Sequence, residues 1–122
     1  MIEAMLIGNT FPLTLVRRRL TVDVVPLEEF RRMAAGRRIV SFWGHANTLH
    51  AASAAVGFDL SPAEERPVLT LSPEALPALG DEVFRECWIL SPDFRRSFRP
   101  AVGDELKPDE ICSWQCLHLV WL

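Results

Sequence analysis

A strand and a helix meet within Arg38-Ile39-Val40-Ser41-Phe42-Trp43-Gly44-His45-Ala46-Asn47-Thr48. The residues before Gly44 are rich in β-branched and aromatic side chains, which is typical of a buried strand. The residues after His45 are rich in alanine as far as Val56, which favours a helix, and Gly57 is a stop signal. This order predicts that His45 lies near the N-terminus of a helix.

The expected position of His45 suits phosphate chemistry. The first turn of a helix offers unpaired N–H groups and the positive end of the helix dipole, and both attract anions. A histidine beside a bound phosphate can act as a general acid near neutral pH. The alternative, which local sequence leaves open, is a histidine that only packs or caps at a strand–helix junction.

Short strands and helices are expected on both sides of this junction. Apolar patterns and turn residues predict strands over 4–7, 20–25, 39–42, 68–71, 83–90 and 115–122. Helices are expected over 27–35 and 47–56, and a short helical turn is expected over 107–110. Two prolines predict a loop over 72–80, and Ser91-Pro92-Asp93 is expected to end the strand before it.

The order of these segments predicts the fold class. We expect an α/β fold, in which a mixed β-sheet of about five to six strands and its flanking helices form a single domain over 1–122. In the first helix, Leu27, Phe30 and Met33 recur at the spacing of one helical face and are expected to be buried. The final strand alternates only weakly, so we expect it to be central and buried on both faces.

Length and composition exclude several classes of protein. The chain has 122 residues, of which 49% are hydrophobic and 24% are charged, as is ordinary for one folded domain. No apolar run approaches the roughly 20 residues that a membrane-spanning helix needs. The segment Met1-Ile2-Glu3-Ala4-Met5 carries an acid and no basic residue, so we expect no signal peptide and a cytoplasmic location.

The cysteines indicate core packing rather than a metal site. Cys87, Cys112 and Cys116 are odd in number and form no CxxC pair, which disfavours disulfides and zinc. Cys112 and Cys116 with His118 would make a partial metal set, but their apolar surroundings favour buried thiols. We therefore expect no metal and no cofactor.

The basic residues are almost all arginine, since twelve of the thirteen are arginine and only Lys107 is lysine. The guanidinium fork binds phosphate in a bidentate way, so the clusters are compatible with a compact polyanionic ligand. A net charge of −3 disfavours duplex nucleic acid as a partner. The alternative is that genomic base composition and a solvated surface explain the arginines. The clusters are Arg17-Arg18-Arg19, Arg31-Arg32, Arg37-Arg38 and Arg95-Arg96 with Arg99.

No common catalytic motif accompanies His45. The sequence lacks a P-loop, a dinucleotide-binding fingerprint, a nucleophile elbow and an HExxH pair. It offers Asn9 after the first strand, and Arg66 and Arg99 near the ends of later strands. Histidine, arginine and amide groups without a metal suit RNA-type phosphodiester cleavage, in which the substrate's own 2′-OH is the nucleophile.

The chain resembles the small viral and phage ring nucleases that act as anti-CRISPR proteins against type III systems. Members of that family bind and degrade cyclic tetra-adenylate, the second messenger that activates the ancillary nucleases of those systems. The resemblance runs over nearly the whole chain, around a Gly-His-x-x-Thr core. The segments that carry it are Leu6-Ile7-Gly8-Asn9-Thr10-Phe11, Ser41 to Thr48, Val56-Gly57, Arg66, Phe98-Arg99 with Gly103, and Ser113 to Trp121.

The resemblance implies a small α/β domain that forms a two-fold homodimer and holds the cyclic oligoadenylate across the dimer axis. The Ala/Ser-rich helix over 47–56 permits the close approach that such a dimer needs. By resemblance, His45 is the general acid, Arg99 lies at the scissile phosphate, and Arg66 holds the ring in the same pocket. The implied reaction is metal-independent attack by the ribose 2′-OH. The other residues for which ligand contacts are expected are Asn9, Thr10, Gly44 and Thr48.

Two positions depart from the family pattern. Pro12 stands where the family has a serine, and Val102 stands where it has a glutamate at the catalytic site. Valine can neither accept a proton nor orient a 2′-OH, whereas Asp104 would face the same side of an extended segment as Val102. Three functions stay open: an active ring nuclease, a non-catalytic protein that sequesters a cyclic nucleotide, and a structural or interaction protein on the same fold.

Overall fold

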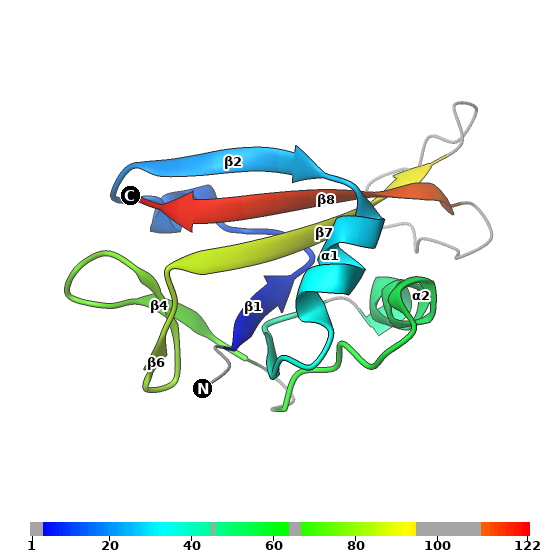
Figure 1. The fold of residues 1–122 in the computed structure, drawn as a ribbon. Helices are drawn as coiled ribbons and strands as arrows, with labels where there is room; N and C mark the ends of the chain where they lie inside the picture. Colours follow the sequence, from blue (N-terminus) through cyan, green and yellow to red (C-terminus); the bar gives the residue numbers. More distant parts are fainter. Residues whose placement is uncertain (1–3, 45, 64–66, 95–110) are drawn as a thin grey trace.

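A five-stranded mixed sheet lies at the centre of the structure (Figure 1). The computed structural model describes residues 4–44, 46–63, 67–94 and 111–122. With a small three-stranded sheet and two α-helices, the large sheet makes a single small α/β domain, which confirms the predicted fold class. In chain order the elements are β1 (Met5–Gly8), the 3-10 helix η1 (Leu13–Leu15), β2 (Leu20–Val25), α1 (Leu27–Ala34), β3 (Ile39–Ser41), α2 (Ala46–Val56), β4 (Leu69–Leu71), β5 (Pro77–Leu79), β6 (Glu82–Val83), β7 (Glu86–Phe94) and β8 (Ile111–Trp121).

The large sheet has the strand order β2-β8-β7-β1-β3. β1 runs parallel to β3 and β7, whereas β8 runs antiparallel to β7 and β2. The carboxyl ends of β1, β3 and β7 therefore meet at one edge of the sheet, which is where open α/β sheets bind ligands. The small sheet has the order β4-β5-β6 and is antiparallel throughout.

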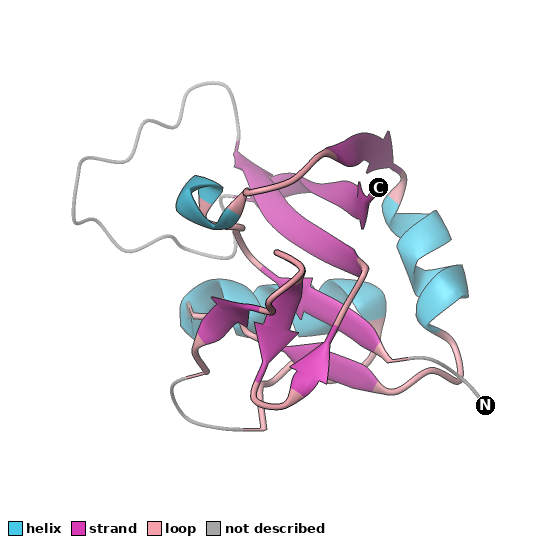
Figure 2. Cartoon of the chain, turned by 90° about the vertical axis from the view of Figure 1, so that its left-hand side faces the viewer, coloured by secondary structure: helices cyan, strands magenta, loops and turns pink. Residues whose placement is uncertain are grey.

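The two faces of β1 are buried in two different cores. Met5 and Ile7 contribute to a core that also includes side chains of α1 and α2, with Trp88 of β7. Leu6 contributes to a second core, which includes Trp121 of β8 and side chains from the small sheet. Because successive side chains of a strand alternate between faces, one short strand joins both cores. Figure 2 shows the large sheet from the side, with α1 and η1 on opposite sides of it.

Each α-helix lies within one residue of its predicted bounds, since α1 ends one residue before the expected end and α2 begins one residue before the expected start. Pro26 precedes α1, and Glu28 and Glu29 lie in its first turn, where carboxylates favour the positive end of the helix dipole. Gly36 follows α1 with a φ of 76°, and Gly57 follows α2 with a φ of 85°. Glycine adopts these left-handed conformations without the strain that a Cβ atom would cause.

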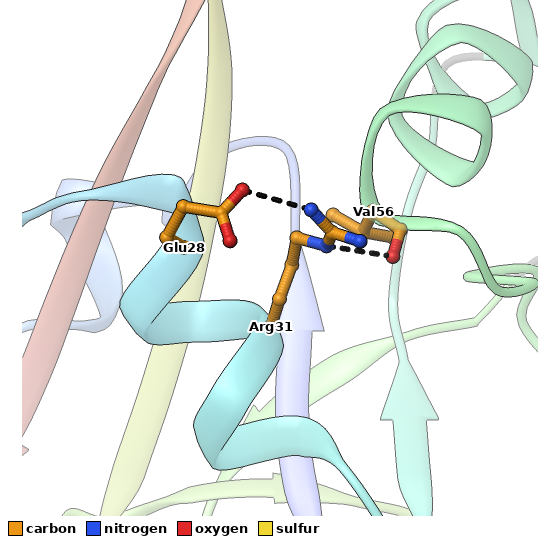
Figure 3. A network of polar contacts seen from close by, with 3 residues as sticks. All are labelled: Glu28, Arg31 and Val56. Carbon is orange, nitrogen blue, oxygen red and sulfur yellow. Dashed lines mark hydrogen bonds and ion pairs between the residues drawn. The ribbon is translucent and has the colours of Figure 1, made fainter.

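Arg31 ties the two helices together (Figure 3). Its Nε donates a hydrogen bond of 3.2 Å to the main-chain oxygen of Val56, and its Nη1 lies 2.8 Å from Oε1 of Glu28. A cation beside the last carbonyl groups of a helix satisfies a free acceptor and interacts favourably with the helix dipole. The carboxyl end of α2 is thereby fixed against α1.

The buried face of α1 differs from the expected one. Phe30 is fully buried and Ala34 is buried beside it, whereas Met33 is 40% exposed. The prediction that Met33 belongs to the buried stripe was therefore wrong. A helix has 3.6 residues per turn, so the face that starts at Leu27 continues through Phe30 to Ala34 instead of advancing three residues at each step.

Two further predictions, the end of a strand at Ser91-Pro92-Asp93 and a loop over 72–80, were also wrong. β7 continues through Ser91-Pro92-Asp93 and pairs with β8 as far as Phe94. Pro92 is tolerated because β1 pairs with β7 only as far as Ile89, so the missing N–H faces a side of β7 that has no described partner strand at that point. The loop expected over 72–80 contains β5, the central strand of the small sheet.

The final strand is internal, as expected, because β8 lies between β2 and β7. It is longer than predicted and is buried only in places, with Cys116, Leu119 and Trp121 buried and Gln115 exposed. The helical turn expected over 107–110 falls outside the described residues. In the part of the chain that the structure describes, neither α-helix is long and apolar enough to cross a membrane.

Replacement of Phe30 by alanine is expected to lower the free energy of unfolding by about 3–5 kcal/mol, because it leaves a cavity between α1 and the sheet. Met33→Ala is the matched control, since it truncates a neighbouring side chain that is half-exposed, and it should cost less than about 1 kcal/mol. Urea unfolding monitored by tryptophan fluorescence measures both values. Equal losses for the two variants would contradict the assignment of the buried face.

Candidate functional site

The carboxyl edge of the parallel strands brings Asn9 and Gly44 together. β1 and β3 are neighbours in register, with Ile7 opposite Ser41 and the N–H of Phe42 donating to the Ile7 carbonyl at 2.9 Å. The residues that follow the two strands therefore leave the sheet side by side. Oδ1 of Asn9 accepts a hydrogen bond of 3.2 Å from the N–H of Gly44.

The turn between β3 and α2 is held by buried hydrogen bonds. Oγ of Ser41 accepts from the N–H of Trp43 at 3.2 Å, and the indole Nε1 of Trp43 donates to Oγ1 of Thr48 at 3.1 Å. Trp43 and Thr48 are 3% and 4% exposed, so these bonds form away from water. Satisfied polar groups in a buried setting favour one geometry, because any other arrangement leaves them without partners.

A glycine in β1 makes room for this turn. A Cβ atom at Gly8 would collide with the aromatic ring of Phe42, so only glycine allows the ring to lie against the β1 backbone at this point. At Gly44, by contrast, a Cβ atom would meet no heavy atom of the described residues within 4 Å. The N-terminal end of the turn is thus closely packed, while the backbone at Gly44 is exposed and is not crowded by the described residues.

Three of the predicted site residues, His45, Arg66 and Arg99, lie outside the described residues, as do Val102 and Asp104. Gly44 precedes position 45 and Ala46 begins α2 directly after it. β7 ends at Phe94 and β8 begins at Ile111, and Phe94 lies five residues along β7 beyond Ile89, the partner of Gly8.

The remaining predicted residues differ in exposure. Asn9 is half-buried, and Thr10 and Gly44 are exposed, so all three are accessible at this edge. Thr48 is buried, and its hydroxyl accepts the indole hydrogen bond described above. A direct contact of Thr48 with a ligand stays a prediction. The positioning contacts of Ser41, Trp43 and Phe42 were not predicted from the sequence, because they depend on how the strand pair and the helix pack.

Several arginines that were candidates for phosphate binding have protein partners. Arg31 binds Glu28 and the end of α2, as described above. Arg18 donates to main-chain oxygens of Glu74 and Leu122, and Arg38 forms an ion pair with Glu82. These contacts favour structural and surface roles for these clusters over a phosphate site.

Two clefts of similar size lie near the arginines and the sheet edges. One, of about 640 Å³, lies at the amino ends of β1 and β3, and its charged lining consists of Arg37, Arg38, Arg85, Glu82 and Glu86. It is remote in the fold from Asn9 and Gly44, and its charges are nearly balanced. The other, of about 620 Å³, is lined by β3 and its neighbours from Arg38 to Ser41, and its lining also includes Pro67 and Val68. We place the candidate site at the carboxyl edge, because only that edge holds Asn9 beside the start of α2.

The described residues give no metal centre, since they contain no group of three His, Cys, Asp or Glu side chains that could hold an ion. Cys116 is buried in the helix-side core, and His118 stacks on Trp88 with 4.0 Å between ring centroids.

Burial raises the pKa of the Cys87 thiol. Burial, with a smaller effect of the Glu29 charge, raises the pKa of Cys116 to about 12.

Comparisons with known proteins give a likeness of fold. Neither the family models nor the curated protein sequences include a match to this chain. Among solved structures, B116 of Sulfolobus turreted icosahedral virus (STIV) matches 98% of this chain and 100% of that protein, with a TM-score of 0.54 and 17% sequence identity. The chain therefore shares its fold, over almost its full length, with a viral protein.

Loss of the Asn9 side chain is expected to loosen the Gly44 backbone. Asn9→Leu removes the acceptor of the Gly44 N–H and should lower the free energy of unfolding by about 1 kcal/mol. It should also speed hydrogen exchange of the Gly44 amide, measured by NMR. Asn9→Asp retains an acceptor oxygen and Thr10→Ala alters only the exposed neighbour, so both should leave that exchange rate close to the parent value. Faster exchange in all three variants would count against the contact.

Stability is expected to fall as the pH rises from about 9 to about 12. Buried thiols stay protonated in the folded chain, whereas the unfolded chain releases their protons above its ordinary thiol pKa of about 8.5. The folded state then binds more protons than the unfolded state, so rising pH favours unfolding. The sequence has no tyrosine and only one lysine, so few other groups ionise in this window. Cys116→Ala should reduce the slope of unfolding free energy against pH in urea titrations, and an unchanged slope would contradict the assignment.

Proposed function

We propose that the chain binds a cyclic oligoadenylate, with cyclic tetra-adenylate as the first candidate, and cleaves it without a metal as a homodimeric ring nuclease. Such an activity would switch off type III CRISPR signalling. The observation that carries the proposal is the hydrogen bond between Asn9 and Gly44. It joins two segments of the family resemblance, Leu6 to Phe11 and Ser41 to Thr48, at the sheet edge where α/β folds bind ligands.

Two further features support this proposal. The free space beside the exposed Gly44 backbone lets a phosphate approach the start of α2, where N–H groups and the helix dipole favour anions. The fold is shared with a viral protein, which agrees with a family of viral and phage inhibitors.

In the proposed reaction the ribose 2′-OH loses its proton to solvent water and attacks the adjacent phosphorus atom, and the bond from phosphorus to the 5′-oxygen breaks. His45 donates a proton to that leaving oxygen, Arg99 neutralises charge on the phosphate, and Arg66 holds the ring. Asn9, Thr10 and Gly44 contact the nucleotide. The products are a linear oligonucleotide with a 2′,3′-cyclic phosphate and a free 5′-hydroxyl.

One observation favours a second candidate function. Val102 offers no group to accept the proton of the 2′-OH or to orient it, and Asp104 replaces the missing carboxylate only if its segment is extended. A chain with an intact binding edge and no such base would hold the ring without breaking it. The second candidate is therefore a protein that sequesters a cyclic nucleotide.

Purified protein incubated with a panel of cyclic oligonucleotides in the presence of a chelator tests both candidates. Ring cleavage is read by separating the products, and binding is read by thermal shift. A ligand present at 100 times its Kd stabilises the folded state by about 2.7 kcal/mol. Cleavage of an adenylate ring supports the nuclease, and a shift without products supports sequestration. No shift with any ring would refute both.

His45→Ala should lower single-turnover cleavage by about 10²–10⁴-fold, which is the usual effect of one general acid. Binding should change far less, because arginines and backbone N–H groups make most phosphate contacts. The rate should fall as the pH rises through the pKa of His45, since only the protonated imidazole donates. His50→Ala is the matched control, because His50 is an exposed histidine within α2. Wild-type cleavage by His45→Ala would end the acid assignment.

A further inference from the structure

The cluster Arg17-Arg18-Arg19 differs from the other described arginine clusters in its charge balance. Arg38 and the two arginines of α1 each form an ion pair with a glutamate. Within the described ranges of the chain, Arg17 and Arg19 form no ion pair, and both are exposed. The Nε of Arg17 donates a hydrogen bond of 3.1 Å to the main-chain oxygen of Thr14, which fixes the guanidinium but leaves its positive charge uncompensated.

The segment that carries this cluster is locally basic. From Thr10 to Val22 the sequence contains three arginines and no aspartate or glutamate. One exposed acid, Glu74, comes close in the fold, since its main-chain oxygen accepts a hydrogen bond of 3.0 Å from Arg18. Charges farther away than about 10 Å are largely screened at about 0.1 M salt. The local positive charge, and not the net charge of −3, therefore governs how this segment interacts with a charged surface.

An exposed apolar side chain lies next to these cations in the chain. Leu13 of η1 is 84% exposed, the largest value among the large apolar side chains of the described residues, and Val16 after it is exposed as well. Because Arg17 donates to Thr14, its guanidinium lies at the same short helix. Single exposed apolar residues are common on protein surfaces. Here the exposure coincides with uncompensated positive charge, and we call the residues from Leu13 to Arg19 the η1 tip.

Contacts on the inner side of η1 hold the tip outward. Phe11, just before η1, packs against Trp121 of β8, with 5.2 Å between the ring centroids. Within η1, the N–H of Val16 donates to the carbonyl of Leu13 at 3.1 Å, and Pro12 restricts φ at the start of the turn. Leu13 therefore stays exposed in the folded chain, because burying it against the core would require these contacts to break.

We propose that the η1 tip binds the surface of an anionic phospholipid bilayer. Leu13 and Val16 enter the boundary between headgroups and acyl chains, while Arg17 and Arg19 interact with lipid phosphates. Apolar insertion and a basic cluster are each weak alone, and together they give reversible membrane binding. The η1 tip lines neither of the two clefts described above, so it projects from the surface. A protein partner would need a pocket shaped for Leu13, whereas a fluid bilayer adapts to a projecting side chain.

This surface is independent of the proposed function. Trp121, against which Phe11 packs, donates its N–H to the carbonyl of Arg85 just before β7 begins. Because β8 runs antiparallel to β7, this contact lies at the amino end of the parallel strands, whereas Asn9 and Gly44 lie at their carboxyl end. The test is made on the protein without nucleotide, so that its failure and the failure of the nuclease proposal are distinguishable.

Co-sedimentation with lipid vesicles tests the charged part of the surface. The full chain should bind vesicles of phosphatidylglycerol and phosphatidylcholine but not vesicles of phosphatidylcholine alone, and about 1 M salt should release it, because the Debye length falls to about 3 Å. Arg17→Glu should lower the partition coefficient at least about tenfold. Arg32→Glu is the matched control, since it makes the same change in net charge at an exposed arginine of α1, and it should bind like the parent chain. Equal weakening by both variants, or a parent chain that binds no anionic vesicle, would overturn the proposal.

Substitutions of Leu13 test the apolar part of the surface. Leu13→Asp should also lower the partition coefficient at least about tenfold, since it replaces the inserted side chain by a carboxylate. Met33→Asp is its control, because Met33 is 40% exposed on α1, on the opposite side of the large sheet from η1 (Figure 2). Brominated lipids should quench the added fluorescence of Leu13→Trp and leave that of Met33→Trp unchanged. If Leu13→Asp binds vesicles as tightly as the parent chain, the surface recognises charge alone, as it would on an acidic protein, and the bilayer proposal is wrong.

Discussion

The structure depends on the burial of both faces of one four-residue strand. β1 is the strand between β3 and β7, and its alternating side chains contribute to the helix-side core and to the core beneath the small sheet. Neither core is complete without it, because Met5 and Ile7 fill one and Leu6 fills the other. A strand that is hydrogen-bonded on both sides and buried on both faces has no freedom to shift its register.

The fixed register of β1 carries over to the candidate site. Because Ile7 stands opposite Ser41, the residues after the two strands leave the sheet together, and Asn9 meets the backbone of Gly44. Gly8 adds a second constraint, since its missing side chain admits the ring of Phe42 and lets the chain turn toward α2. At the far end of α2, Arg31 holds the helix against α1. Contacts at both ends of α2 therefore fix the position of the helix, and none of these contacts requires a bound ligand.

The local sequence was sufficient to predict the bounds of helices and strands where a residue type has one structural effect. Pro26, Gly36 and Gly57 mark the helix ends correctly, and the alternation of 20–25 gives β2 its observed bounds. The same reasoning failed where the structure of a residue depends on the strands and helices that pack beside it. A proline such as Pro92 predicts the end of a strand when only the local sequence is considered. Here its missing N–H faces the side of β7 along which β1 no longer pairs, so the strand continues. Met33 is apolar and follows the buried residues of α1 at a spacing of three. The helical period of 3.6 residues nevertheless places its side chain away from the core.

For the candidate site, the sequence predicts residue types but not their contacts. The prediction of Asn9 and Gly44 rests on resemblance, and their hydrogen bond becomes visible only once β1 and β3 are paired. Thr48 shows the opposite case, because its place in the Gly-His-x-x-Thr pattern suggests a ligand contact, while in the fold its hydroxyl holds the indole of Trp43.

The position of β8 has a consequence for how the chain folds. β8 is inserted between β2 and β7, although β2 comes near the start of the sequence and β8 near its end. β2 therefore has no partner strand within the large sheet until β8 has been synthesised. Such non-local pairing makes folding slow, since a long loop must close before any contact compensates for the lost entropy. During that interval the valines of β2 are exposed in the nascent chain, which makes this segment a site for chaperone binding or premature association between chains.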